Sequence, residues 1–128
     1  MERQTRYLTS ERLQSVALEY DWPGQFMIED DADGLYLRLP DCSLYFEEDS
    51  DGDVQLSFVG EGLPDPVDIR QVLSALEIRD AQSQAYLPAT HYASIAKVEG
   101  EVHELCRLAL THLRPTLQGD FSWASKLS

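Results

Sequence analysis

Hydrophobic residues in the first part of the chain repeat with the period of a helix. The repeating set consists of Leu13, Val16, Ala17 and Tyr20. Intervals of three and four residues place these side chains on one helical face. Thr9 or Ser10 can cap such a helix, and the Asp-Trp-Pro-Gly stretch at 21–24 ends it.

The next part of the chain alternates with a period of two, which is typical of strands. One face carries Phe26, Ile28, Leu35, Leu37, Leu39, Leu44, Phe46, Val54, Leu56 and Phe58. The other face carries Tyr36, Arg38, Ser43, Tyr45, Gln55 and Ser57. Turn residues at 33–34, 40–41 and 51–52 separate the runs. We therefore predict an antiparallel meander with strands at 35–39, 42–47 and 54–59, and an additional strand at 25–29.

The second half of the chain returns to helical spacing. Asp65, Pro66 and Asp68 have the order of a helix start, with an acid as N-cap and Pro at the first position. The apolar stripe of this helix is Ile69, Val72, Leu73 and Leu76. A last long helix is predicted from Val102, Leu105, Ala109 and Leu113, and Pro115 or Gly119 interrupts it.

Residues 83–98 fit two interpretations. Tyr86-Leu87 and 95–98 can form two short strands around a turn at 88–91, which is the interpretation we prefer. Ile95 and Val98 can also extend the last helix backwards, because a spacing of three and four residues continues through Gly100.

These elements predict an α+β fold in a single domain, residues 1–128. It has an N-terminal helix, an antiparallel meander of three to five strands and two further helices. A chain of 128 residues can bury a core of its own. The sequence has no apolar run of membrane-spanning length and no signal-peptide pattern, so we expect a cytoplasmic protein without membrane contact. In that compartment Cys42 and Cys106 stay thiols.

The charge is strongly negative and unevenly distributed. The chain has 10 Lys+Arg against 23 Asp+Glu, a net charge of −13. Fifteen of the acids and a single base, Arg38, fall within 13–69. Nucleic acid is therefore excluded as an expected partner, because phosphate binding needs a basic surface. An acidic surface can also serve solubility alone.

Acidic residues gather in two predicted turns that an antiparallel meander places at the same end of the sheet. They are Glu29, Asp30, Asp31, Asp33, Glu47, Glu48, Asp49, Asp51 and Asp53. The stretch 49–53 looks like a calcium loop, but Val54 and Gly60 stand where such a loop needs Gly and a bidentate Glu. A hairpin turn is the better interpretation. The patch of Asp30, Asp31, Asp33, Glu48, Asp49 and Asp51 is a candidate surface for a basic partner.

Candidate catalytic and metal-binding residues are few. His103 and Cys106 have metal-ligand spacing on one helix, but no second pair completes a site. His91 and His112 are isolated in the sequence. No nucleophile motif or phosphate-binding glycine loop is present. We expect no enzymatic activity, no metal and no cofactor.

The order of elements resembles the class I chaperones of bacterial type III secretion. The resemblance is carried by the sequence from Leu18 to Gly24, the strands at 35–39, 42–47 and 54–59, Gly62-Leu63-Pro64, the 73–76 helix core, and a closing helix with Trp123. These chaperones are small acidic α+β proteins, usually homodimers, that keep the N-terminal segment of a secreted effector unfolded. The extra strand at 25–29 and the weak strand signal after the second helix depart from the pattern.

The resemblance implies a non-enzymatic chaperone whose partner is a secreted effector. An extended client segment can pair with a strand edge and place apolar side chains on shallow patches. The expected contact residues are Leu13, Val16, Tyr20, Tyr36 and Tyr45. The expected homodimer contacts are Val72, Leu73, Leu76 and Leu87.

The alternative is an acidic immunity or inhibitor protein that neutralises a basic toxin. Complementary charge speeds association and selects a partner. This alternative places the site on Asp30, Asp31, Glu48, Asp49 or Asp51, and complex formation should then be sensitive to salt.

Overall fold

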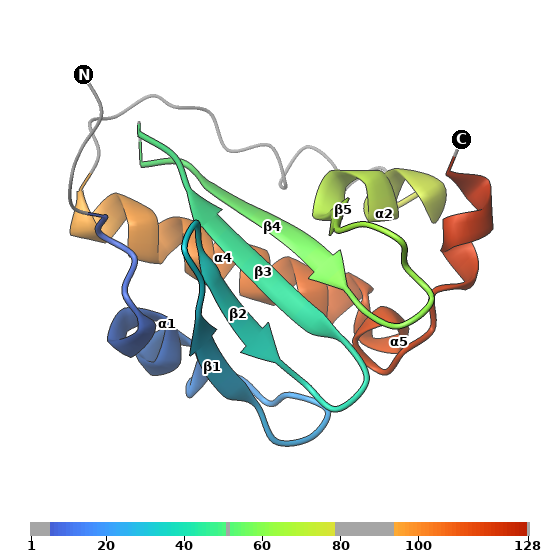
Figure 1. Cartoon of the computed structure of the whole chain (residues 1–128), viewed down its shortest axis with the longest axis horizontal. Coiled ribbons are helices and arrows are strands. Elements are labelled where there is room, and N and C mark those ends of the chain that lie inside the picture. Colours follow the sequence, from blue (N-terminus) through green and yellow to red (C-terminus); the bar gives the residue numbers. More distant parts are fainter. Residues whose placement is uncertain (1–5, 51, 79–93, 128) are drawn as a thin grey trace.

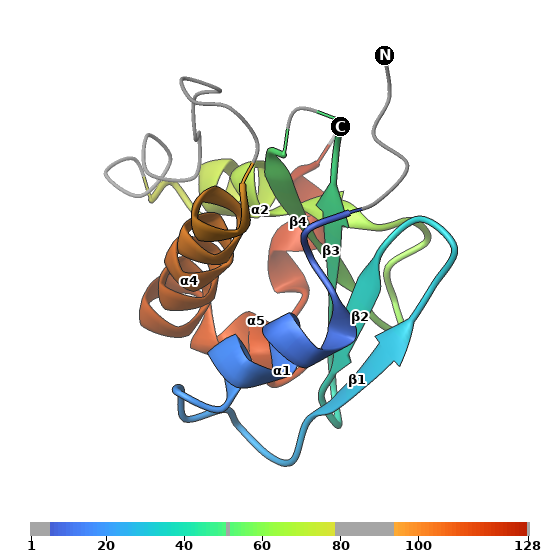
Figure 2. The same cartoon turned by 90° about the vertical axis from the view of Figure 1, so that its left-hand side faces the viewer.

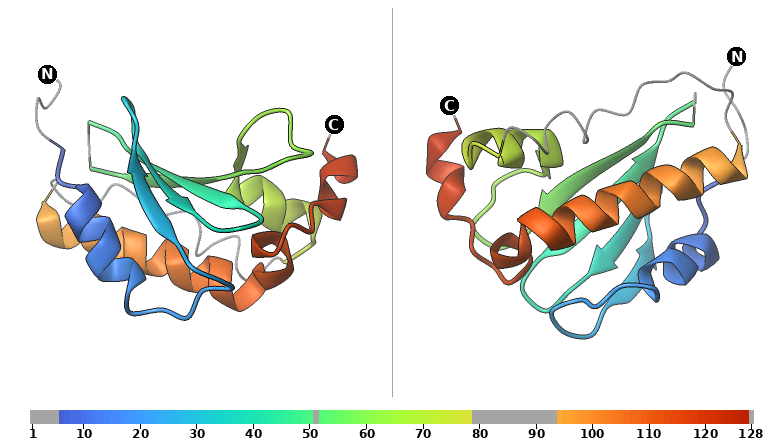
Figure 3. Two further views of the ribbon diagram at one scale, coloured as in Figure 1. Left: turned by 60° about the horizontal axis from the view of Figure 1, so that its bottom comes forward. Right: turned by 180° about the vertical axis from the view of Figure 1, so that it is seen from behind.

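The chain folds into one antiparallel sheet with helices packed against one of its two faces (Figures 1 and 3). The computed structural model describes residues 6–50, 52–78 and 94–127. The elements are α1 (Ser10–Ala17), β1 (Met27–Asp30), β2 (Leu35–Arg38), β3 (Ser43–Glu48), β4 (Val54–Val59), β5 (Val67–Asp68), α2 (Ile69–Ala75), α4 (Ile95–His112), α5 (Arg114–Leu117) and the 3₁₀ helix η1 (Ser122–Lys126). The predicted α+β fold is confirmed.

The sheet is a meander in which each strand pairs with its neighbour in sequence, in the order β1-β2-β3-β4-β5. The strands predicted at 35–39, 42–47 and 54–59 form within one residue of the expected ends. β1 corresponds to the additional strand expected at 25–29. β5 is a two-residue strand that sequence reasoning missed, since only Val67 and Asp68 pair with β4.

One face of the sheet forms the hydrophobic core. Its fully buried side chains are Leu37, Leu44, Phe46, Leu56 and Phe58. Helices α1 and α4 lie against this face, as Figure 3 shows from below and from behind. Each such side chain contributes roughly 1.5–3 kcal/mol relative to exposure, so the alternating pattern carries much of the folding free energy.

The start of α1 agrees with the sequence. Thr9 is the N-cap, and its side chain accepts a hydrogen bond from the Arg12 N–H. None of the helices within the described residues is both long enough and apolar enough to cross a membrane.

The preferred strand interpretation of 95–98 is wrong, because these residues begin α4. Ser94 caps the helix by accepting a bond from the Lys97 N–H, and Val98 is fully buried. Gly100 lies inside the helix with open space around it, so it costs only its intrinsic helix penalty. The other half of the expected strand pair, Tyr86-Leu87, lies outside the described residues.

The start of the second helix also differs from the prediction. α2 begins at Ile69 with Asp68 as N-cap, not at Asp65 and Pro66. Asp68 forms a reciprocal capping box with Gln71, which satisfies free N–H groups at the helix start. Val67 and Asp68 pair with β4 just before this point, so the strand delays the helix.

Candidate functional site

The two acidic turns lie at the same end of the sheet, as the antiparallel meander requires. The β1–β2 turn follows Asp30, and the β3–β4 turn follows Glu48. We call residues 30–34, 47–50 and 52–53 the acidic end. Asp51 of the predicted patch lies outside the described residues.

Glu48 does not belong to the solvent-exposed patch, which corrects its predicted place. Its residue is only 3% exposed. The carboxylate accepts hydrogen bonds from the Tyr7 N–H at 3.2 Å and the Leu8 N–H at 2.7 Å. The guanidinium of Arg6 donates to the Glu48 carbonyl. Glu48 therefore fastens the segment before α1 to the end of β3.

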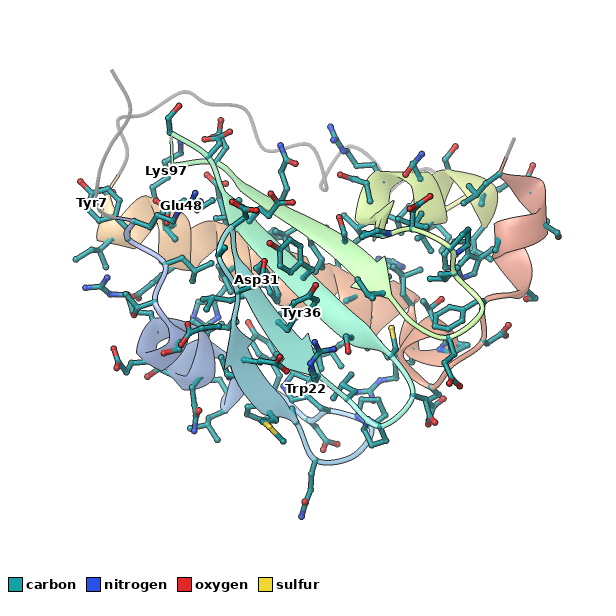
Figure 4. All side chains as sticks on the ribbon, viewed as in Figure 1. Tyr7, Trp22, Asp31, Tyr36, Glu48 and Lys97 are labelled. Atoms are coloured by element: carbon teal, nitrogen blue, oxygen red, sulfur yellow. The ribbon has the colours of Figure 1, made fainter. Side chains whose placement is uncertain are left out.

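The direction of the Glu48 side chain follows from strand alternation. Leu44 and Phe46 point into the core, so the next residue of that parity points inward as well. Figure 4 shows Glu48 in the same corner of the molecule as Tyr7 and Lys97. The alternation was the sequence signal that could have identified Glu48 as a buried acid.

A second set of charged groups links the β3–β4 turn to α4. The Lys97 ammonium lies 2.8 Å from an Asp53 carboxylate oxygen and 3.9 Å from one of Glu101. Glu101 also accepts a bond from the Val54 N–H at 2.9 Å. Burial raises the pKa of Glu101, and the Val54 N–H and the Lys97 charge oppose this shift. Sequence reasoning missed this set, because Asp53 and Val54 lie more than 40 positions from Lys97 and Glu101.

Asp31 is fixed by the outer face of the sheet, the face away from the helices. Its carboxylate accepts a hydrogen bond from the Tyr45 hydroxyl at 2.8 Å. This bond lowers the pKa of Asp31. The pKa of Tyr45 is raised, mainly by burial of its hydroxyl and then by the hydrogen bond to Asp31 and the charge of Asp31. Gly34 leaves room for this arrangement, since a Cβ there would lie 2.9 Å from the Tyr45 ring and 2.4 Å from the Phe46 carbonyl oxygen.

The outer face carries a row of aromatic and charged groups. The rings of Tyr36 and Tyr45 lie 4.6 Å apart between centroids. The Arg38 guanidinium lies 4.2 Å from the Tyr36 ring centroid and forms an ion pair with Glu29. In Figure 4, Tyr36 and Asp31 lie on the side of the sheet toward the viewer, while α4 passes behind it. No helix of the described chain covers this outer face (Figures 1 and 3).

β1 forms a free edge of the sheet within the described residues (Figure 2). The Asp31 N–H donates to the Gly34 carbonyl, so these two residues form a hydrogen-bonded pair. Hydrogen-bonded and non-hydrogen-bonded pairs alternate along an antiparallel ladder, so the main-chain groups of Met27 and Glu29 also bond to β2. The N–H and C=O groups of Ile28 and Asp30 therefore point away from the sheet. Met27 is 65% exposed, and three of the four β1 residues are exposed.

The predicted contact residues fall into different environments. Leu13 and Val16 are buried in the core of the chain and offer no surface to a partner. Tyr20 is partly buried, and its hydroxyl lies 2.8 Å from Nδ1 of His103, which links the segment after α1 to α4. Tyr36 is partly exposed on the outer face, whereas Tyr45 is nearly buried beneath it. The structure thus brings Tyr36 and Tyr45 together and separates them from the helix residues.

The predicted dimer residues are largely internal. Val72 and Leu73 are fully buried in the core of the chain, and Leu76 is partly buried against it. Leu87 lies outside the described residues. Packing of α2 against the chain's own sheet and η1 accounts for Val72 and Leu73, so neither offers a surface for a second copy.

A pocket of about 300 Å³ opens at the acidic end. It lies between the segment that leads into α1, the end of β1 and the β1–β2 turn. Leu8, Leu35 and Phe46 are its buried apolar lining, and Asp30 and Asp31 are exposed at it. We call it the acidic-end pocket.

The cysteines and His103 have structural contacts. Cys42 and Cys106 are free and buried, and burial raises the pKa of each thiol to about 12. A thiol with so high a pKa is a poor nucleophile. His103 contacts Tyr20 and lies 3.5 Å from a Glu19 carboxylate oxygen. Residues 6–50, 52–78 and 94–127 contain no group of three or more His, Cys, Asp or Glu placed to hold a metal ion.

Comparison with known proteins gives no relative: no family model, no curated protein and no solved structure matches the chain. The predicted order of an N-terminal helix, a meander and a second helix is present, and residues 95–98 are helical.

Proposed function

We propose that this chain is a non-enzymatic binding protein that holds an extended segment of a partner protein on the free edge of β1. An effector chaperone of type III secretion, which the element order resembles, is one form of this role. The observation that carries the proposal is the edge itself. Ile28 and Asp30 present main-chain donors and acceptors outward, beside a sheet face that no described helix covers.

An extended segment can satisfy these groups by adding one strand to the sheet. Main-chain hydrogen bonds then supply affinity, and alternate side chains of the segment supply specificity. The exposed Met27 side chain and the half-exposed Tyr36 ring lie on the outer face, where they can contact such side chains. This role requires no catalytic group.

The acidic inhibitor alternative has less support from the geometry. Three acids of the end are engaged within the chain: Glu48 with Tyr7 and Leu8, Asp53 with Lys97, and Asp31 with Tyr45. A basic toxin would therefore meet fewer available carboxylates than the sequence suggests.

The edge is tested by a matched pair of variants at one position. Ile28→Pro removes an outward N–H without removing a bond to β2, and proline is tolerated on edge strands. Ile28→Ala keeps the N–H and loses the same side-chain packing. The partner is first recovered with the tagged full chain from a lysate of its own host and purified as a complex.

We expect the wild-type chain and Ile28→Ala to hold the partner segment and Ile28→Pro to lose it. In the wild-type complex, hydrogen exchange at the Ile28 and Asp30 amides should slow. Equal binding by Ile28→Pro would contradict edge pairing. A folded basic partner that protects 31–34 and 49–53 and dissociates in moderate salt would instead support the inhibitor alternative.

A further inference from the structure

A lysine, an aspartate and a glutamate meet where the β3–β4 turn reaches the start of α4. The Lys97 ammonium nitrogen lies 2.8 Å from Oδ1 of Asp53 and 3.9 Å from Oε2 of Glu101. The Val54 N–H donates to the other oxygen of Glu101, Oε1, at 2.9 Å. This bond holds Glu101 next to the turn that carries Asp53 and leaves Oε2 as the oxygen nearest the amine.

The three groups are largely withdrawn from water. The side chains of Lys97 and Glu101 are 8% and 10% exposed, and that of Asp53 is 21% exposed. Exclusion of water favours the condensation of an amine with a carboxyl group, because water is a product of that reaction. A contact fixed by the fold also replaces an encounter between separate molecules, which raises the rate of such a reaction by many orders of magnitude. Lys97 and Asp53 are therefore reactants held in place as well as an ion pair.

We infer that Lys97 and Asp53 condense to an isopeptide bond, an amide between Nζ of Lys97 and Cγ of Asp53, with Glu101 as the proton carrier. This chemistry goes beyond the proposed binding role and does not depend on it. The reaction consumes only groups of the chain itself. Its product ties the β3–β4 turn to α4 across 44 positions of the chain.

The condensation balances with one water as the product. A proton first passes from the Lys97 ammonium to the Asp53 carboxylate along their hydrogen bond, which leaves a neutral amine beside a carboxylic acid. The amine nitrogen attacks Cγ of Asp53, and the Glu101 carboxylate takes a second proton from that nitrogen. Glu101 then returns this proton to the departing hydroxyl group, the Cγ–O bond breaks and water leaves. Glu101 ends in the form in which it began.

The charges around Lys97 set the pace of the reaction. Burial lowers the pKa of Lys97, but the hydrogen bond to Asp53 and the charges of Asp53, Glu101 and Asp49 together raise it. The neutral amine is therefore a minor form, so the newly folded chain holds the ion pair and the amide accumulates afterwards. Burial raises the pKa of Glu101, which suits a group that takes and returns a proton.

The bond is tested by mass spectrometry of the purified full chain, freshly prepared and after a week at neutral pH. We expect the intact mass to fall with time by the mass of one water molecule. After denaturation and digestion with trypsin, the peptides 39–70 and 80–107 should be found joined, because Lys97 in an amide is no longer a cleavage site.

Three variants identify the groups that react. Lys97→Arg keeps the positive charge but lacks the amine, so it should retain its full mass. Glu101→Gln cannot carry the proton and should slow the loss of water at least about 100-fold. Glu104→Gln is the matched control, since it removes a carboxylate of the same helix that pairs with Arg107, and it should react like the wild type.

The inference is wrong if the wild-type chain keeps its full mass throughout, or if Glu101→Gln loses water as fast as the wild type. Aspartate followed by glycine can also lose water by forming a succinimide, and the chain has such pairs at 33–34 and 51–52. Water loss confined to those pairs, without joined peptides, would therefore contradict the inference as well. The search for joined peptides in the wild type decides the question even if a variant fails to fold.

Discussion

An oxygen of the Glu48 carboxylate lies 2.7 Å from the main-chain nitrogen of Leu8, 40 positions earlier in the chain. Its other oxygen lies 3.2 Å from the nitrogen of Tyr7. One buried carboxylate thus accepts hydrogen bonds from two consecutive main-chain N–H groups that the fold partly shields from water. The segment before α1, which lines the acidic-end pocket, is positioned by these bonds.

Glu48→Gln should destabilise the fold, because one amide N–H₂ must then face main-chain donors. We expect a loss of about 2–3 kcal/mol in the free energy of unfolding, measured by urea titration, since bonds to charged groups contribute roughly 1.5–3 kcal/mol each. The Leu8 amide should also exchange faster with solvent. The control Glu47→Gln, at the exposed neighbouring position, should stay within about 0.5 kcal/mol of the wild type. Equal effects of both variants would contradict the assigned role of Glu48.

Glu101 should give the stability a specific dependence on pH. Burial raises its pKa, so over a range above its ordinary value of 4.5 the folded chain retains a proton that the unfolded chain has lost. The contribution of Glu101 to the free energy of unfolding is therefore complete below its ordinary pKa and is lost as pH rises through the raised pKa.

The difference in unfolding free energy between the wild type and Glu101→Gln should accordingly fall as pH rises through this range. Urea titrations of both proteins at several pH values measure it. Glu61→Gln, which removes an exposed carboxyl, should not reproduce the trend. A difference that rises with pH would show that Lys97 and the Val54 N–H dominate over burial.

Tyr45→Phe should raise the pKa of Asp31 toward its ordinary value of 3.8, because the variant lacks the hydroxyl that bonds the carboxylate. Because the pKa of Asp31 is lowered in the folded chain, Asp31 stabilises the fold at pH values above its ordinary pKa. This contribution to the free energy of unfolding is lost as pH falls through the lowered pKa. Tyr45→Phe should lack that contribution.

The titration of Asp31 can be followed by the NMR shift of its carboxyl carbon. Tyr36→Phe is the matched control, since it removes a hydroxyl from the other ring of the pair without touching the bond to Asp31. An unchanged Asp31 titration in Tyr45→Phe would show that the hydroxyl does not control this carboxylate.

Leu73→Glu should unfold the chain, because a charged carboxylate would replace a fully buried leucine. We expect the free energy of unfolding to fall by more than about 4 kcal/mol, which is a large part of the total for an ordinary domain. Circular dichroism and light scattering measure folding and mass together. Ser74→Glu, at the exposed next position, should stay folded. A folded Leu73→Glu monomer derived from a wild-type dimer would instead place Leu73 at a dimer interface.

The sequence alone was sufficient for β1 to β4 and for the start of the first helix. The alternation through Leu35, Leu44 and Val54 encodes strand pairing locally, and Thr9 caps the helix through a neighbour three positions away. It also placed both acidic turns at one end of the sheet, because an antiparallel meander leaves no other arrangement.

The sequence could not decide which side chains the tertiary structure would cover. Leu13 and Val72 lie on apolar stripes that would serve a partner surface or a core equally well, and the fold buries both. Residues 95–98 were ambiguous for the same reason, since a short apolar run fits a strand or a helix until packing selects one.

What the sequence determined about this protein is its local periodicity, and with it an α+β fold with a strongly acidic end. What only the tertiary structure decided is the environment of each charge. Glu48 turns inward to Leu8, Lys97 meets Asp53, and Glu101 meets Val54, in each case across 40 or more positions. The physical reason is that burial and hydrogen bonding depend on which groups meet in space, and chain-distant partners leave no spacing in the sequence to read.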